Sequence, residues 1–331
     1  MSVLSRRLGW ALVGISLLLL AITVCIFALQ PDRFSAFTVM PIWLWGGVGL
    51  FLSLTALYFL RARFALVTTA LWCVTVLIGA DETSALWNWG NPPPLPGPPQ
   101  AHEGKPVIRV ATLNCCVFGY GDPSDDLAAW QPDIVLLQDA WPHQAAQIAQ
   151  KLYQGRGELS FLRSNAVITR WKITRSISEP GTKSQQVTVQ LPGNLSIEVV
   201  NVHLPSAATD LRLWRKSAWV RHRDNRFLRQ RELELTNKIL RATTLFPNTP
   251  TLLGGDFNAP ATDSVHRQLT PDFVNSFAAV GSGWGNTYQR RLPVVRIDHL
   301  YATPHFTPIR SRVVHTRHSD HRMVISDFGL R

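Results

Sequence analysis

Three long apolar runs at the start of the chain, at about residues 10–29, 41–60 and 64–80, limit its fold more than any other feature. A helix needs roughly 17 to 25 predominantly apolar residues to cross a bilayer, and each run approaches or reaches that length. The alternative is a cleaved signal peptide followed by buried core helices. The first run lacks a small-residue cleavage site, however, and two more runs follow it. The sequence therefore predicts a membrane anchor over residues 1–83 with three transmembrane helices.

The positions of the arginines predict how this anchor is oriented. Arg6 and Arg7 precede the first run, and Arg61 and Arg63 lie between the second and the third. Short loops rich in Lys and Arg stay on the cytoplasmic side of a membrane. We therefore expect a multi-pass protein of the cell (cytoplasmic) membrane with a cytoplasmic N-terminus. Three spans then place the rest of the chain on the extracytoplasmic or periplasmic side.

A proline-rich segment separates the anchor from the remainder of the chain. Residues 91–100 read NPPPLPGPPQ, which favours neither helix nor sheet because proline fixes φ and lacks an N–H donor. At about 3.1 Å per residue, such a segment makes a semi-rigid spacer of roughly 30 Å. Trp87 and Trp89 come just before it, where indoles favour the membrane-water interface. We expect a linker over residues 84–104.

Beyond the linker, over residues 105–331, the pattern changes to short runs rich in Val, Ile and Leu. The strand candidates are VIRVATLN, DIVLLQD, NAVITR, QQVTVQL, LSIEVVNVHL, TLLGGDFN, RIDHLYAT and HRMVISDF. WPHQAAQIAQKL and the stretch from about Arg212 to Ala242 favour helices. Strands that alternate with a few helices are typical of an α/β or α+β domain with buried sheets. This part of the chain also holds all ten histidines.

Polar side chains recur at the ends of these predicted strands. They are Asn114, Gln138, Asp139, His203, Asp256, Asn258, Asp298, His299, Asp320 and His321. Taken singly, an Asn or Asp after a strand is usually turn chemistry, and a lone His near a core is usually just hydrogen-bonded. Together, these carboxylates, amides and imidazoles are harder to dismiss. They predict a shared cleft at the strand ends.

The ordered motifs TLN, LLQD, NAVITR, NVHLPS, GGDFNAP, RIDHLYAT and HSDHRMV resemble the endonuclease/exonuclease/phosphatase superfamily, the magnesium-dependent phosphoesterases related to DNase I. The resemblance covers about residues 105–331, and GDFN followed by SDH is its most specific part. It implies a four-layer α/β/β/α sandwich of two mixed sheets, with the active site where the strand ends converge. In layout the chain also resembles membrane-anchored bacterial members associated with glycopeptide-antibiotic resistance and envelope lipid carriers.

The resemblance implies catalytic roles for five residues. Asp256 would orient and deprotonate the attacking water, and Asn258 would hold that water and a phosphate oxygen. His321, paired with Asp298, and His203 would bind the scissile phosphate and stabilise its developing charge. These roles suit the chemistry, because phosphate ester cleavage needs donors and cations aimed at the phosphoryl oxygens together with a positioned water.

The resemblance also implies a metal site. Asn114 and Asp139 would hold a divalent ion, with Asp320 as a further ligand or as the group that orients the metal shell. Oxygen ligands of this kind suit Mg²⁺, with Mn²⁺ as an alternative. The chain departs from the family at Gln138-Asp139, where the usual pair is Gln-Glu. The shorter side chain withdraws the carboxylate by roughly 1.5 Å, so the ion would shift, bind through water or bind weakly.

The identity of the phosphorylated substrate stays open at this level. An anchored enzyme gains from confinement near a lipid bilayer, which favours an envelope lipid phosphate. Residues 211–234 interleave basic and aromatic side chains, and such a segment could follow a nucleic-acid backbone, lie on an anionic membrane, or be a solvated helix face with its aromatics in the core. An anchored nuclease and a catalytically weakened module that binds phosphorylated lipid or a protein partner are therefore alternatives. No protein partner can be named.

Overall fold

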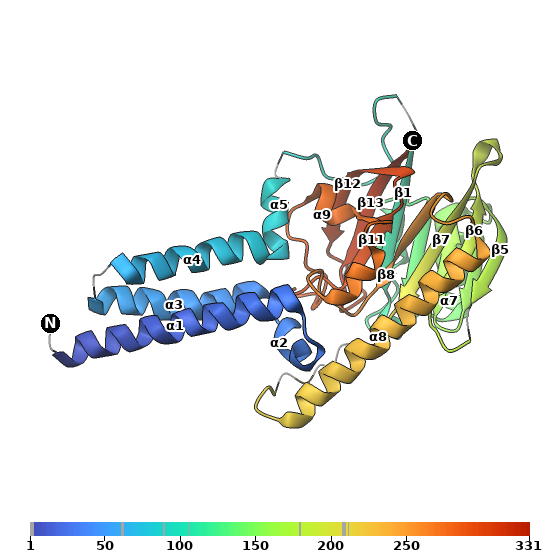
Figure 1. Ribbon diagram of the computed structural model, residues 1–331. Helices are drawn as coiled ribbons and strands as arrows, with labels where there is room; N and C mark the ends of the chain where they lie inside the picture. Colours follow the sequence, from blue (N-terminus) through green and yellow to red (C-terminus); the bar gives the residue numbers. More distant parts are fainter. Residues whose placement is uncertain are drawn as a thin grey trace.

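The computed structural model joins a helical stalk to a domain built on β-sheets, with the N-terminus at the far end of the stalk (Figure 1). Arg61, Trp89 and Leu211, which enter the predictions above, lie outside the described residues. The structure describes residues 3–60, 63–88, 90–104, 106–178, 180–206, 210 and 212–331.

The stalk consists of three helices that lie side by side: α1 (Val3–Leu29), α3 (Ile42–Leu60) and α4 (Arg63–Gly79) (Figure 1). One polar contact joins all three. The indole Nε1 of Trp72 donates to Ser16 Oγ at 3.0 Å, and Ser16 Oγ donates to the carbonyl oxygen of Gly49 at 3.1 Å. A Cβ atom at Gly49 would lie 1.9 Å from the Trp72 ring, so glycine permits the close packing of α3 on α4.

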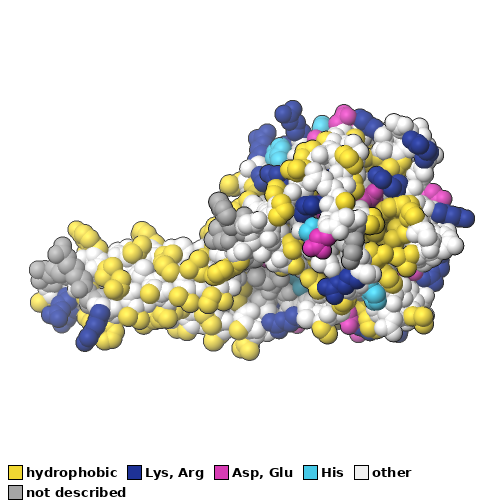
Figure 2. All heavy atoms as spheres, turned by 90° about the horizontal axis from the view of Figure 1, so that it is seen from above, with side chains coloured by type: hydrophobic (Ala, Val, Ile, Leu, Met, Phe, Trp, Pro, Cys, Tyr) yellow, Lys and Arg dark blue, Asp and Glu magenta, His cyan; other side chains and the backbone are white. Residues whose placement is uncertain are grey.

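The structure contains two helices, α1 and α3, that are long and apolar enough to cross a membrane, rather than the three expected. The third apolar run does form helix α4, but it has 17 residues and measures about 26 Å at 1.5 Å per residue, which is short of a hydrocarbon core of about 30 Å. Apolar side chains cover the visible surface of the stalk, and basic side chains gather at its far end (Figure 2). Arg6, Arg7 and Arg63 are all exposed.

The strands of the described chain form two mixed sheets. The seven-stranded sheet has the order β10 (Gly281–Ser282), β12 (Phe306–Val314), β13 (Met323–Leu330), β1 (Val107–Asn114), β2 (Ile134–Gln138), β4 (Asn165–Thr169) and β3 (Glu158–Leu162). The six-stranded sheet has the order β5 (Lys172–Ser178), β6 (Gln185–Gln190), β7 (Ser196–His203), β8 (Thr251–Asp256), β11 (Asp298–Ala302) and β9 (Val274–Asn275). Strands β1 and β2 pair in parallel in the first sheet, as β7 and β8 do in the second, and most other pairs are antiparallel.

The two sheets pack face to face, and helices cover their outer faces. Because successive side chains of a strand point to opposite faces, Val110 of β1 enters the core between the sheets while Ala111 enters the outer core. In the same way Leu252 of β8 faces the inner core and Leu253 the outer one. Burial on both faces explains the nearly continuous apolar runs of these strands. The expected arrangement of two mixed sheets in an α/β sandwich is therefore present.

The outer helices complete the layers. Helices α6 (Ser124–Ala128) and α7 (Pro142–Tyr153) belong to the seven-stranded sheet, and α8 (Lys216–Thr243) and the 3₁₀ helix η5 (Ser264–Leu269) cover the six-stranded sheet. Helix α7 starts with proline at its first position, where the missing N–H costs nothing. All eight strand candidates and both helix candidates from the sequence are present, within a few residues at their ends.

The proline-rich segment forms neither helix nor strand, as expected, but it lies against the domain instead of standing free. The guanidinium of Arg109 is fully buried, and its Nη1 donates to the carbonyl oxygens of Leu95 and Gly97 at 2.9 and 2.7 Å. The same side chain pairs with Asp327 through Nε and Oδ1 at 2.7 Å. This buried ion pair holds the segment on the edge of β1.

The basic and aromatic segment 211–234 falls on α8 and the turn before it, and none of its three interpretations fits it as a whole. Arg226 and Arg229 are buried beside Asp263, so they serve contacts within the protein. Trp214 and Phe227 are 79% and 58% exposed, so these aromatics do not enter the core.

Candidate active site

Strand register brings the polar strand ends together. In the parallel pair β7/β8, His203 lies opposite Asp256, and in the antiparallel pair β8/β11 the same Asp256 lies opposite Asp298. On the other sheet Asn114 ends β1 opposite Gln138, which ends β2. Residues far apart in the sequence thus reach one end of the sandwich through pairing alone.

Asp256 is the centre of the hydrogen-bond network. Its side chain is buried and accepts from Asn114 Nδ2 at 2.9 Å, from the backbone N–H of Asn258 at 2.8 Å and from Asn258 Nδ2 at 3.2 Å. Asn258 Nδ2 also donates to the carbonyl oxygen of Leu204 at 3.0 Å. Burial first, and then the charge of Asp298, raise the pKa of Asp256, while His321 and His203 partly offset the rise. The two asparagines therefore fix a carboxylate that binds a proton more readily than an ordinary aspartate.

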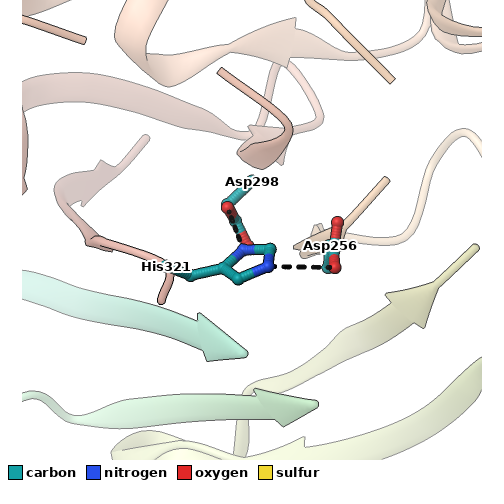
Figure 3. A group of neighbouring side chains, drawn as sticks. All are labelled: Asp256, Asp298 and His321. Carbon is teal, nitrogen blue, oxygen red and sulfur yellow. Dashed lines mark hydrogen bonds and ion pairs between the residues drawn. The ribbon is translucent and has the colours of Figure 1, made fainter. Parts of the chain in front are cut away.

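His321 lies between two carboxylates (Figure 3). Its Nδ1 is 2.9 Å from Asp298 Oδ2, and its Nε2 is 4.0 Å from Asp256 Oδ2. Burial lowers the pKa of His321, but the charges of Asp298 and Asp256 outweigh it and raise the pKa to about 10. At neutral pH this imidazole is a cation, fixed in orientation by Asp298.

His203 approaches the same carboxylate from the neighbouring strand, with Nε2 3.9 Å from Asp256 Oδ2 and Nδ1 3.5 Å from Asp139 Oδ1. Burial lowers the pKa of His203, and the charges of Asp256 and Asp139 only partly restore it. A neutral imidazole and a cationic one, His321, therefore face each other across Asp256.

These side chains line a cavity of about 490 Å³, a size typical of small-ligand sites. Of the eight residues proposed from the sequence, Asp298 does not line it, because it sits behind His321 and is fully buried. The other seven line the cavity: Asn114, Asp139, His203, Asp256, Asn258, Asp320 and His321.

Three oxygen-bearing side chains of the cavity fit a hard divalent cation. Asp320 and Asp139 are only half-buried, and Asp320 Oδ1 has no hydrogen-bond partner among the described residues. Burial, and after it the charge and hydrogen bond of Asp320, raise the pKa of the neighbouring Cys116 to about 11. Asn114 adds an amide oxygen that accepts one hydrogen bond, from the backbone N–H of Cys116 at 2.8 Å. Carboxylates and an amide oxygen are ligands that Mg²⁺ prefers.

A second group of potential ligands, Asp256, Asp298 and His321, has its donor atoms within 4.8 Å of one another. We assign it to phosphate chemistry instead of metal binding. A doubly protonated imidazole has no lone pair left for a metal, and the two carboxylates keep His321 in that state.

Two residues that the sequence did not single out support the site. Ser319 Oγ donates to the carbonyl oxygen of Asn114 at 2.6 Å and accepts from the backbone N–H of His321 at 3.0 Å, so it ties the end of β1 to the loop before β13. Tyr288 lines the cavity with its ring 5.1 Å from that of His321. Ser319 lies inside the HSDH motif, which was the available signal, whereas nothing in the sequence around Tyr288 pointed to the site.

Comparisons with known proteins agree with this architecture. The model of the Endonuclease/Exonuclease/phosphatase family matches residues 111–321. A family protein from Bacteroides thetaiotaomicron has a similar structure (TM-score 0.54, 14% identity, 69% of this chain and 99% of that one). So does a mannosyl-6-phosphatase from the same species (TM-score 0.50, 16% identity, 67% and 99%). D. rerio TDP2 in complex with a single-strand DNA product is also similar (TM-score 0.52, 15% identity, 67% and 99%). No curated protein matches the sequence significantly.

Proposed function

The chain belongs to the endonuclease/exonuclease/phosphatase family, whose members hydrolyse phosphoesters, and from this premise we propose that it is a metal-dependent hydrolase of a phosphodiester or phosphoanhydride bond. One observation supports the proposal above all. A cationic imidazole (His321), a neutral imidazole (His203) and a hydrogen-bonded carboxylate of raised pKa (Asp256) face one cavity together with oxygen ligands for a cation.

Asp256 is the proposed general base. Its carboxylate is held by Asn114 and Asn258, and a raised pKa brings a base closer to the pH at which it works. A water held by Asn258 and Asp256 would give its proton to Asp256 as its oxygen attacks phosphorus. The amide of Asn258 has a second task, since its oxygen and nitrogen can also orient a phosphoryl oxygen.

His321 is the proposed electrophilic group. As an imidazolium oriented by Asp298 at 2.9 Å, it would donate a hydrogen bond to a phosphoryl oxygen, where negative charge grows in the transition state. His203 would add a further donor from the adjacent strand. Because these donors are fixed before substrate binds, they need little reorganisation during the reaction.

Asp139, Asp320 and Asn114 would hold the metal ion, for which Mg²⁺ is the first choice and Mn²⁺ the alternative. When bound, the ion would neutralise charge on the phosphoryl oxygens. Asp139 reaches the cavity in spite of its short side chain, and its Oδ1 lies 3.5 Å from His203 Nδ1. Aspartate in place of the family's usual glutamate is therefore compatible with a role in this site.

We further propose that the enzyme is anchored in the cytoplasmic membrane with its sheet domain on the extracytoplasmic side. The length and apolar surface of α1 and α3 support the anchor, and the exposed arginines Arg6, Arg7 and Arg63 at the end remote from the domain support the orientation. An anchored hydrolase meets substrates of the membrane surface at high local concentration. We therefore favour a phosphorylated envelope lipid as substrate.

A nuclease is the second candidate, since the TDP2 structure contains a single-strand DNA product and the present chain carries a formal net charge of +11. The test is hydrolysis by the full-length protein in lipid nanodiscs, with Mg²⁺ or with chelator, of a polyprenyl diphosphate, a phospholipid and single-stranded DNA. Metal-dependent release from a lipid, absent in Asp256→Asn, supports the proposal. Release from DNA alone would establish the nuclease instead, and binding of a substrate without turnover would indicate a module that has lost catalysis.

A further inference from the structure

The cavity that holds the proposed catalytic groups is not built by the sheet domain alone. Val39, Met40 and Pro41 line it together with Asp256 and His321. These three residues belong to the connection between the short helix α2 (Ser35–Thr38) and α3, which means that they are part of the stalk. The site is therefore composite, with one wall from the stalk and the rest from the domain.

The stalk residues extend an apolar side of the cavity. From the domain, Val294, Val295 and Ile297 line the same cavity as the stalk segment Val39–Pro41, and none of these side chains offers a hydrogen bond to a phosphate. A small hydrophilic phosphate would leave this surface in contact with water. An apolar group attached to the phosphate would cover it, which is the favourable arrangement.

The position of this wall indicates where the apolar group comes from. Val39–Pro41 directly precedes Ile42, the first residue of α3, at the end of the stalk that adjoins the sheet domain (Figure 1). The stalk beyond this point carries exposed apolar side chains, among them Leu44 and Val48. An apolar chain that leaves the cavity over Val39–Pro41 would therefore pass directly onto the apolar surface of α3, without crossing a charged region of the stalk (Figure 2).

Buried polar contacts fix this wall relative to the catalytic groups. The guanidinium of Arg226 on α8 is fully buried; it pairs with Asp263 at 3.1 Å and donates to Gln30 Oε1 at 3.2 Å and to Thr38 Oγ1. Thr38 is the residue immediately before the wall. Because the contacts of a buried charge are costly to break, the stalk and the domain hold one arrangement at this point.

A second ion pair fastens the other end of the joint. Arg296, next to Ile297 of the cavity, makes a bidentate pair with Asp81 just after α4, with Nη2–Oδ1 and Nε–Oδ2 distances of 2.6 and 2.9 Å. Such paired hydrogen bonds add geometric specificity to the attraction of the charges. The wall is therefore a preorganised part of the site, fastened on both sides.

We propose that Val39, Met40 and Pro41 form a subsite for the apolar chain of a membrane-resident lipid whose phosphate is bound by His321 and His203. The stalk then selects the substrate in addition to confining the enzyme to the membrane. This inference rests on the proposed hydrolase function and adds the substrate class, a phosphorylated lipid with a long apolar chain that enters from the leaflet next to the domain.

The test compares matched substrates that differ only in chain length, using the full-length protein in nanodiscs. One pair is isopentenyl and geranylgeranyl diphosphate, and the other is glycerophosphocholine and dioleoylphosphatidylcholine. The variant is the double substitution Val39→Asn with Met40→Ser. Its control is Val274→Asn on the edge strand β9, where the side chain is 40% exposed and outside the cavity.

We expect the ratio of kcat/KM for the long-chain substrate to that for its short-chain partner to fall about tenfold or more in the double variant, because polar side chains in an apolar pocket discriminate against the chain. The Val274→Asn control should keep the wild-type ratio. A ratio that stays the same in the double variant overturns the subsite, and so does a wild-type protein that hydrolyses only the short-chain substrates or DNA. A wild-type protein with bound metal that hydrolyses no phosphate ester at all refutes the proposed function itself.

Discussion

Replacing Asp298 by asparagine tests what this carboxylate does for His321. The substitution keeps the shape of the side chain and removes its charge, 2.9 Å from Nδ1 of the imidazole. At an effective dielectric constant of about 20 the Coulomb attraction across this distance is about 6 kcal/mol. Desolvation offsets part of it, and loss of one partner of a buried ion pair costs about 3–5 kcal/mol in practice.

If the imidazolium stabilises the transition state, that cost corresponds to a fall in kcat/KM of about 100- to 5000-fold for Asp298→Asn. The assay is metal-dependent hydrolysis at neutral pH by the full-length protein, with the unfolding temperature measured in parallel. The matched control is Asp126→Asn, since Asp126 pairs with His318 Nδ1 at 3.1 Å in the same way but outside the cavity, with side chains 26% and 32% exposed. A folded Asp298→Asn enzyme within tenfold of wild type would refute the role given to this pair.

Three further perturbations have definite outcomes. Burial lowers the pKa of His266 to about 4 against an ordinary value of 6.5, so unfolding takes up a proton below pH 6.5; wild type should lose about 2 kcal/mol of stability between pH 6.5 and 5, and His266→Gln should show a flatter pH dependence of its unfolding temperature. Asp320→Asn should raise the Mg²⁺ concentration for half-maximal activity at least tenfold and weaken Mn²⁺ binding measured by calorimetry, and an unchanged metal dependence would remove Asp320 from the metal site. Ser319→Ala should cost about 1–3 kcal/mol of unfolding free energy, because it leaves the Asn114 carbonyl and the His321 N–H without their partner, and a loss below 0.5 kcal/mol would contradict that role.

The fold of the sheet domain was predictable because its central strands are buried on both faces. Such strands need continuous runs of Val, Ile and Leu, as in β1 and β8, and these runs stand out in a sequence. Strands β5 and β12 were not predicted. The side chains of β5 are largely exposed and its sequence KITRSIS is mostly polar, while β12 contains Pro308 at a register shift. Where the apolar signal is weak, only pairing with a neighbouring strand identifies the element.

The candidate site was predictable to the extent that polar residues at strand ends meet through strand pairing. Asp256 and Asp298 are separated by 42 positions in the sequence, yet they lie directly opposite each other in β8 and β11. The composite wall was not predictable in this way. Val39–Pro41 reaches the cavity through packing between the stalk and the domain, and Arg226 is buried by the same packing although its sequence context suggests an exposed basic face. Contacts of this kind leave no periodic pattern in either segment.

The central claim, that the cavity activates a water against phosphorus, is tested most directly by hydrolysis in H₂¹⁸O. Full-length protein with Mg²⁺ is incubated with a polyprenyl diphosphate and a phospholipid, and the released phosphate product is analysed by mass spectrometry beside an Asp256→Asn sample. The account predicts one ¹⁸O atom in each phosphate product of the wild-type reaction and no product from the variant or with chelator. Equal product from Asp256→Asn, or no product from folded, metal-bound wild type with any phosphate ester, would contradict it.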